Sequence, residues 1–118
     1  MKKTKYGDYQ KRIRFKMFSN YDIYVVFTND IAKSRKARYG TAGLAEGANG
    51  LHTQGIGGKA HLFFLIANSS PQIIAHECYH AIYGMLVGWM EAGDAGNEVY
   101  AYLVGWLVGQ VHKFKEAL

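Results

Sequence analysis

The sequence is poor in cysteine, in proline and in charge, and it has no long uninterrupted apolar run. Its single cysteine, Cys78, cannot form an intramolecular disulfide, which excludes a disulfide-stapled secreted scaffold and favours a reducing compartment. Charged residues make up only 19% and hydrophobic residues 49%, the opposite of the balance that produces intrinsic disorder. The two apolar stretches, 73–90 and 99–111, fail as membrane spans because the first contains a glutamate and two histidines and the second is shorter than about 18 residues. We therefore expect a soluble, cytoplasmic protein without a membrane segment, and the basic N-terminus lacks the apolar stretch of a signal peptide.

A chain of 118 residues corresponds to a single domain, 1–118, in which residues 1–20 form a basic N-terminal strand or arm. The net charge of +5 is unevenly distributed. Residues 1–40 hold eleven Lys or Arg and three Asp, a balance of +8, and residues 41–118 hold three Lys and six acids, a balance of −3. This basic third is either a solubilising face or a surface for nucleic acid or an acidic partner, although no nucleic-acid motif accompanies the charge.

The order of the predicted elements indicates an α+β fold, with a small sheet of about three to four strands followed by two long helices. Alternation and β-branched content predict strands at 12–18, 22–28, 51–54 and 59–66. A short basic helix is expected at 31–39, between an Asn-Asp cap and Gly40. The two long helices are expected from Pro71 to between Gly84 and Met90, and over 97–114, with a glycine-rich break at 91–97.

The first long helix carries the sequence His76-Glu77-Cys78-Tyr79-His80, which is the HExxH pattern. Residues at i and i+4 project from the same face of a helix one turn apart, so both imidazoles can bind one metal ion. Neutral imidazoles suit zinc, and bound zinc lowers the pKa of its water towards neutrality. Glu77 lies about 100° further round the helix, within reach of that water, and we expect it to act as the general base. The alternative is a structural group of two histidines and a glutamate satisfied by hydrogen bonds.

A catalytic zinc needs a third protein ligand and one open position. Glu91 would lie about 16 Å along the helix from His80 if the helix continued that far, which is out of reach. His112 lies late on the last helix. Glu98 is the best candidate because it opens that helix after a glycine-rich loop, and Asp94 is the alternative. The alternative for Glu98 is a carboxylate that only interacts with the positive end of the helix dipole. Cys78 is interpreted as a small buried side chain rather than a ligand.

The combination of HExxH with the Asn97-Glu98 pair on a following helix resembles the gluzincin metallopeptidases. The small size resembles the single-domain minigluzincins, and the block NEVYAYLVGWL (97–107) resembles small phage-encoded zinc peptidases. The resemblance covers about residues 59–110. It implies a zincin-like fold, zinc held by His76, His80 and Glu98, and peptide-bond hydrolysis with Glu77 as general base. For a viral protein the compartment would be the host cytoplasm. By the same resemblance, an extended substrate would lie along a strand beside the zinc helix, either 59–66 or the one near Leu51.

Two functions from different classes remain open. The first is a zinc metallopeptidase acting on a peptide or protein substrate. The second is a zincin-like metal-binding module without efficient catalysis, which regulates a partner or binds nucleic acid through the basic N-terminal third. The presence of Glu77 favours the first function, since a purely structural site does not need it. The small size favours the second, since no further domain supplies the other wall of a cleft.

Overall fold

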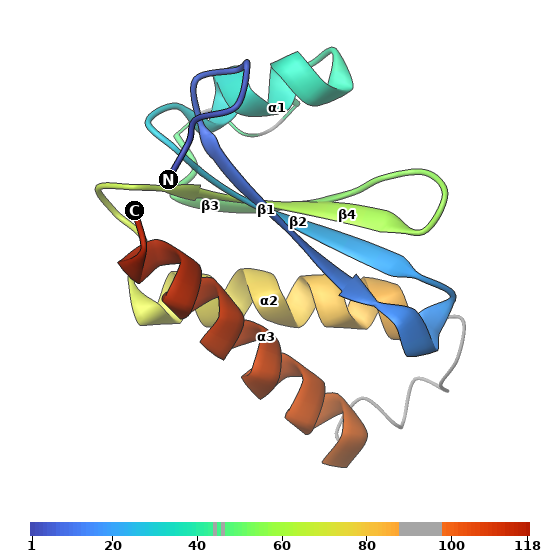
Figure 1. Ribbon diagram of the computed structural model, residues 1–118. Helices are drawn as coiled ribbons and strands as arrows, with labels where there is room; N and C mark the ends of the chain where they lie inside the picture. The colour runs from blue at the N-terminus through green and yellow to red at the C-terminus, as the bar shows by residue number, and fades with distance from the viewer. Residues whose placement is uncertain (44, 46, 88–97) are drawn as a thin grey trace.

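The computed structural model describes residues 1–43, 45, 47–87 and 98–118. Within them the fold is α+β, as predicted, with one four-stranded mixed sheet in the order β1-β2-β4-β3 (Figure 1). The strands are β1 (Tyr9–Phe15), β2 (Tyr21–Thr28), β3 (Gly50–Gln54) and β4 (Lys59–Leu65). The helices are α1 (Ile31–Tyr39), α2 (Pro71–Leu86) and α3 (Glu98–Glu116), with a 3-10 turn η1 (Lys16–Phe18) after β1.

The two central strands, β2 and β4, run parallel, and each edge strand runs antiparallel to its neighbour. Both central strands are buried on both faces, which explains their nearly continuous hydrophobic sequences. Side chains of alternate strand residues point to opposite faces of the sheet and form two hydrophobic cores. The larger core lies between the sheet and the helix pair α2 and α3, and the smaller lies under α1 (Figure 1). Sheet residues of the larger core include Ile23, Val25, Phe27, Leu62 and Phe64.

Local signals in the sequence set the helix ends. Asp30 accepts a hydrogen bond from the Lys33 N–H at the start of α1, and Gly40 ends that helix in the left-handed conformation. Ser70 caps α2, and Pro71 occupies its first turn, where a missing N–H costs nothing. The predicted start and end of α2 are thereby confirmed, whereas the predicted break at 91–97 lies outside the described residues.

The prediction of a strand at 12–18 is wrong at its C-terminal end. Pairing with β2 ends at Phe15, and residues 16–18 form η1. Ser19 and Asn20 both adopt left-handed backbone angles there, which reverses the chain into β2. Met17 therefore leaves the line of buried side chains that continues from Ile13 to Phe15 and is 87% exposed.

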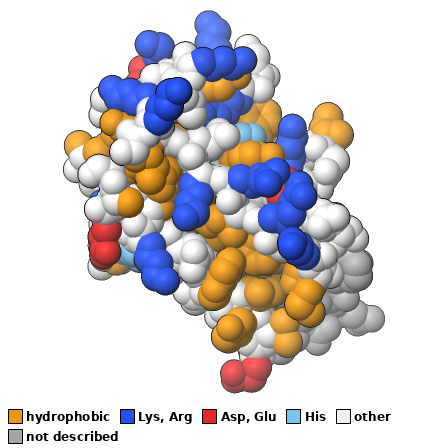
Figure 2. Space-filling view, viewed as in Figure 1, with side chains coloured by type: hydrophobic (Ala, Val, Ile, Leu, Met, Phe, Trp, Pro, Cys, Tyr) orange, Lys and Arg blue, Asp and Glu red, His pale blue; other side chains and the backbone are white. Residues whose placement is uncertain are grey.

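The basic N-terminal third forms β1, β2 and α1. Figure 2 shows Lys and Arg side chains over this part of the molecule and hydrophobic side chains gathered over α3 below it. Some of these cations stabilise the fold itself: Arg38 pairs with the buried Asp8, and Arg14 pairs with Asp22. No described helix is long and apolar enough to cross a membrane.

Candidate metal centre

Helix α2 brings three of the predicted site residues together. The potential ligand atoms of His76, Glu77 and His80 all lie within 4.8 Å of one another. The two imidazoles are exposed, whereas Glu77 is only 9% exposed. The pattern follows from helix periodicity, since i and i+4 share an outer stripe and i+1 turns towards the sheet.

The two imidazoles have the separation that one tetrahedral zinc requires. The Nε2 atoms of His76 and His80 are 3.2 Å apart, and their rings meet nearly at a right angle with centroids 4.7 Å apart. Two nitrogens bound to one zinc at 2.0–2.1 Å with a tetrahedral angle would be about 3.3 Å apart. The separation of the pair therefore matches that of two nitrogens on one zinc ion.

Glu77 lies between this pair and the edge strand β3. Burial raises the pKa of its carboxyl group, while His76, His80 and a hydrogen bond from the His52 backbone N–H lower it. The net direction is upward. A buried carboxyl group at this distance from the histidine pair can accept a proton from a water bound there.

Strand β3 approaches α2 closely because its first residue is glycine. A Cβ atom at Gly50 would lie 2.6 Å from Cγ2 of Ile73 and 3.1 Å from Cγ of Glu77. On the other side, Leu65 N–H donates to the Asn49 carbonyl and Gly55 N–H donates to the Lys59 carbonyl. In an antiparallel pair the intervening residues alternate, so the backbone groups of Gly50, His52 and Gln54 point away from β4, at the free edge beside Glu77.

His52 on β3 is a further neighbour of the site. Its ring lies nearly parallel to that of His80, with centroids 6.1 Å apart, and its side chain hydrogen-bonds Gln54. Burial lowers its pKa, and His80 lowers it further. Among the described residues its Nε2 atom is buried without a hydrogen-bond partner. Only the pairing of β3 beside α2 reveals this position, which no local sequence pattern indicates.

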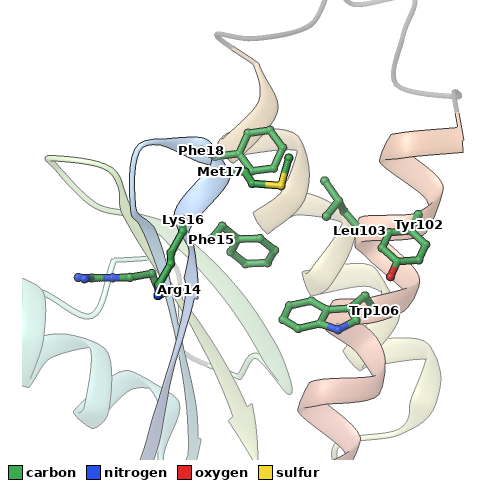
Figure 3. Close-up of a pocket in the computed structure, with 8 residues that line it drawn as sticks. All are labelled: Arg14, Phe15, Lys16, Met17, Phe18, Tyr102, Leu103 and Trp106. Atoms are coloured by element: carbon green, nitrogen blue, oxygen red, sulfur yellow. The ribbon is translucent and has the colours of Figure 1, made fainter.

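Glu98 does not join the histidine pair in the structure. It is exposed at the first residue of α3 and lines a groove with Met17, Phe18 and Tyr102. The adjoining groove between η1 and α3 is lined by Phe15, Met17 and Trp106, among others (Figure 3). The alternatives Glu91 and Asp94 lie outside the described residues. Glu98 as a zinc ligand thus stays a prediction.

The structure also places two other residues considered as ligands, Cys78 and His112. Cys78 is buried in the main core, where burial raises the pKa of its thiol to about 12, so it is a packing residue, as expected. His112 is half-buried on the last two turns of α3 and is not part of the cluster on α2.

Comparisons of the chain with protein-family models, with curated proteins and with solved structures give no match. The cluster of His76, Glu77 and His80, with its surroundings, is therefore the feature from which a function can be inferred.

Proposed function

We propose that this protein is a small zinc-dependent metallopeptidase of the gluzincin type. The observation that carries the proposal is the 3.2 Å separation of the His76 and His80 Nε2 atoms beside the buried carboxyl group of Glu77. A pair of hydrogen-bonded histidines on a helix surface needs no buried glutamate at i+1. A hydrolytic zinc site does need one, because its attacking water must lose a proton.

The chain's residues divide the chemistry between them. Zinc, when bound by His76 and His80, supplies a water of lowered pKa and polarises the carbonyl that is attacked. Glu77 accepts the proton of that water as the carbon–oxygen bond forms, and then donates it to the amide nitrogen as the carbon–nitrogen bond breaks.

The free edge of β3 provides a means of holding a peptide next to the histidine pair. The outward backbone groups of Gly50, His52 and Gln54 can pair with an extended chain as an additional strand. Glu77 currently accepts the His52 N–H, so substrate binding by this route competes for that donor and frees the carboxylate for catalysis.

The third zinc ligand in this proposal is Glu98, which must move from the groove beside Met17 to reach the histidine pair. Glu98→Gln retains the size of the side chain but weakens it as a ligand. We expect zinc affinity to fall by at least 10-fold, measured by competition with a chelator. Unchanged affinity would exclude Glu98 and leave the site with a different third ligand.

The direct test of the function compares Glu77→Gln with the wild type in zinc content and in cleavage of a broad peptide library. Glu77→Gln should keep its zinc and lose at least about 100-fold in kcat/KM, since the amide cannot accept the proton. Glu116→Gln, a matched change on the exposed end of α3, should leave the activity intact. Cleavage that persists in Glu77→Gln, or a zinc-loaded wild type that cleaves no peptide, contradicts the proposal.

One observation favours a second function, a metal-binding module without efficient catalysis. Among the described residues only His76, Glu77 and His80 form a metal-ligating group, and Glu98 lies apart from it. Under this alternative the wild type binds zinc but cleaves nothing. The exposed cations of residues 1–40 would then contact an acidic partner or nucleic acid, which is testable by salt-dependent binding.

A further inference from the structure

Two exposed tyrosines lie beside the candidate metal centre on α2. The rings of Tyr79 and Tyr83 stack with an interplanar angle of 17° and centroids 6.4 Å apart. They are 46% and 42% exposed, so much of this aromatic surface faces solvent. The Tyr79 ring also lies 6.0 Å from the ring of His80. In the sequence the two tyrosines stand one residue before His80 and three residues after it.

Tyr79 lies on the side of the histidine pair opposite β3, and Tyr83 follows on the same outer face of α2. At about 100° per residue, Glu77 turns from His76 towards β3, whereas Tyr79 lies about 60° from His76 in the other direction and Tyr83 lies within about 20° of it, beyond His80 along the helix. The imidazoles therefore lie between β3 and Tyr79, with Tyr83 beside them along the helix. A peptide held along β3 and across the metal would extend side chains over the two phenol rings.

Helix α3 holds Tyr79 in place, and Tyr83 stacks on Tyr79. The Tyr100 hydroxyl of α3 donates to the Tyr79 carbonyl at 3.2 Å, and their rings meet edge to face at 5.4 Å. Among the described residues, no Lys or Arg lies over Tyr79 or Tyr83, whereas Tyr6, Tyr9 and Tyr39 each lie under a cation. Tyr79 and Tyr83 are each exposed by more than 40%, so part of their surface remains available to another ring.

We propose that Tyr79 and Tyr83 form a binding subsite for an aromatic side chain close to the scissile bond of the substrate. This inference rests on the proposed function, because the metal and the β3 edge determine where the peptide lies. Two stacked rings offer a third one both offset-stacked and edge-to-face arrangements at centroid distances of about 4.5–7 Å. We therefore expect the substrates to be peptides with Phe, Tyr or Trp near the cleaved bond.

The test measures binding in zinc-loaded Glu77→Gln, so that it does not depend on turnover. Two blocked Gly-Ser heptapeptides, identical except for a central Phe or Ala, are titrated and followed by NMR. The Phe peptide should bind at least about 10-fold tighter. Adding Tyr79→Ser and Tyr83→Ser should remove that preference, while Tyr102→Ser, a matched change at a 71% exposed tyrosine of α3, should retain it.

Variants that keep the fold make the result decisive. Tyr83→Ser alone spares the contact between Tyr79 and Tyr100 and should reduce the preference for Phe, and Tyr79→Phe should preserve it. A parent protein without a preference for Phe, or a preference that survives the double substitution with zinc retained, overturns the inference. Failure of the proposed hydrolysis appears separately, as a wild type that binds the Phe peptide through these tyrosines but cleaves no peptide.

Discussion

His61 is a buried histidine on the α1 side of the sheet, away from the candidate metal centre. Its Nδ1 atom lies 2.5 Å from the Tyr39 hydroxyl, and its ring lies parallel to that of Tyr24 at 4.9 Å. Burial lowers its pKa to about 4, and the positive charges of Arg38 and Lys59 add to this effect. The folded protein therefore keeps a neutral imidazole that is hydrogen-bonded to the tyrosine hydroxyl.

This histidine predicts a loss of stability at mildly acidic pH. An unfolded histidine takes up its proton near pH 6.5, whereas folded His61 does so only near pH 4. The free energy of unfolding should thus fall as the pH is lowered from about 6.5 to 4, by up to about 3 kcal/mol. Urea unfolding at several pH values measures this dependence. The free energy of unfolding should change less with pH in His61→Phe than in the wild type. His52, whose pKa is also lowered, contributes the remainder. An unchanged slope in His61→Phe would contradict this account.

At the scale of elements, the contact between β3 and α2 positions Glu77, and it depends on Gly50. In Gly50→Ala the new Cβ atom would collide with Ile73 and press on Glu77. We expect a loss of about 1–3 kcal/mol in the free energy of unfolding, as for other overpacked sites.

The control for this substitution is Gly105→Ala on α3, where an added Cβ meets nothing within 4 Å. Because alanine favours a helix interior over glycine, this variant should gain up to about 1 kcal/mol. Chemical denaturation of both variants measures the difference. Equal effects at the two glycines would show that β3 and α2 are not closely packed.

Elements whose signals are local could be predicted from the sequence. The cap of Ser70 and Pro71 begins α2, and helix periodicity then brings the imidazoles of His76 and His80 together. The end of β1 was misplaced because the left-handed residues Ser19 and Asn20 carry no glycine signal. The positions of His52 and Glu98 relative to the histidine pair depend on how β3 and α3 pack. That packing is determined by contacts between residues far apart in the sequence.

At the scale of the whole molecule, a buried ion pair joins the N-terminal segment to α1. Asp8 and Arg38 have side chains 1% and 5% exposed and are linked by two hydrogen bonds. Burial alone would raise the pKa of Asp8, but the hydrogen bonds from Arg38, Thr4 and Ser34 hold it below its usual value. Part of the basic N-terminal third therefore stabilises the fold, because Arg38 attaches α1 to the N-terminal segment.

Removing one partner of this pair should destabilise the whole domain. Arg38→Met leaves the Asp8 carboxylate buried without its cation and should cost about 3–5 kcal/mol in urea unfolding. Arg38→Met combined with Asp8→Asn should recover part of that loss, since no unpaired charge remains. A loss below about 1 kcal/mol in the single variant would show that the pair is solvated.

The central claim is that His76 and His80 bind one zinc ion, with Glu77 beside it. The most direct measurement is the zinc content of the purified protein after saturation with zinc and removal of the excess, in the wild type and in His76→Ala. The wild type should hold close to one zinc per chain, and His76→Ala should hold almost none while keeping its circular dichroism spectrum, because His76 is an exposed side chain on α2. A wild type without zinc, or a His76→Ala variant that retains it, would contradict the account.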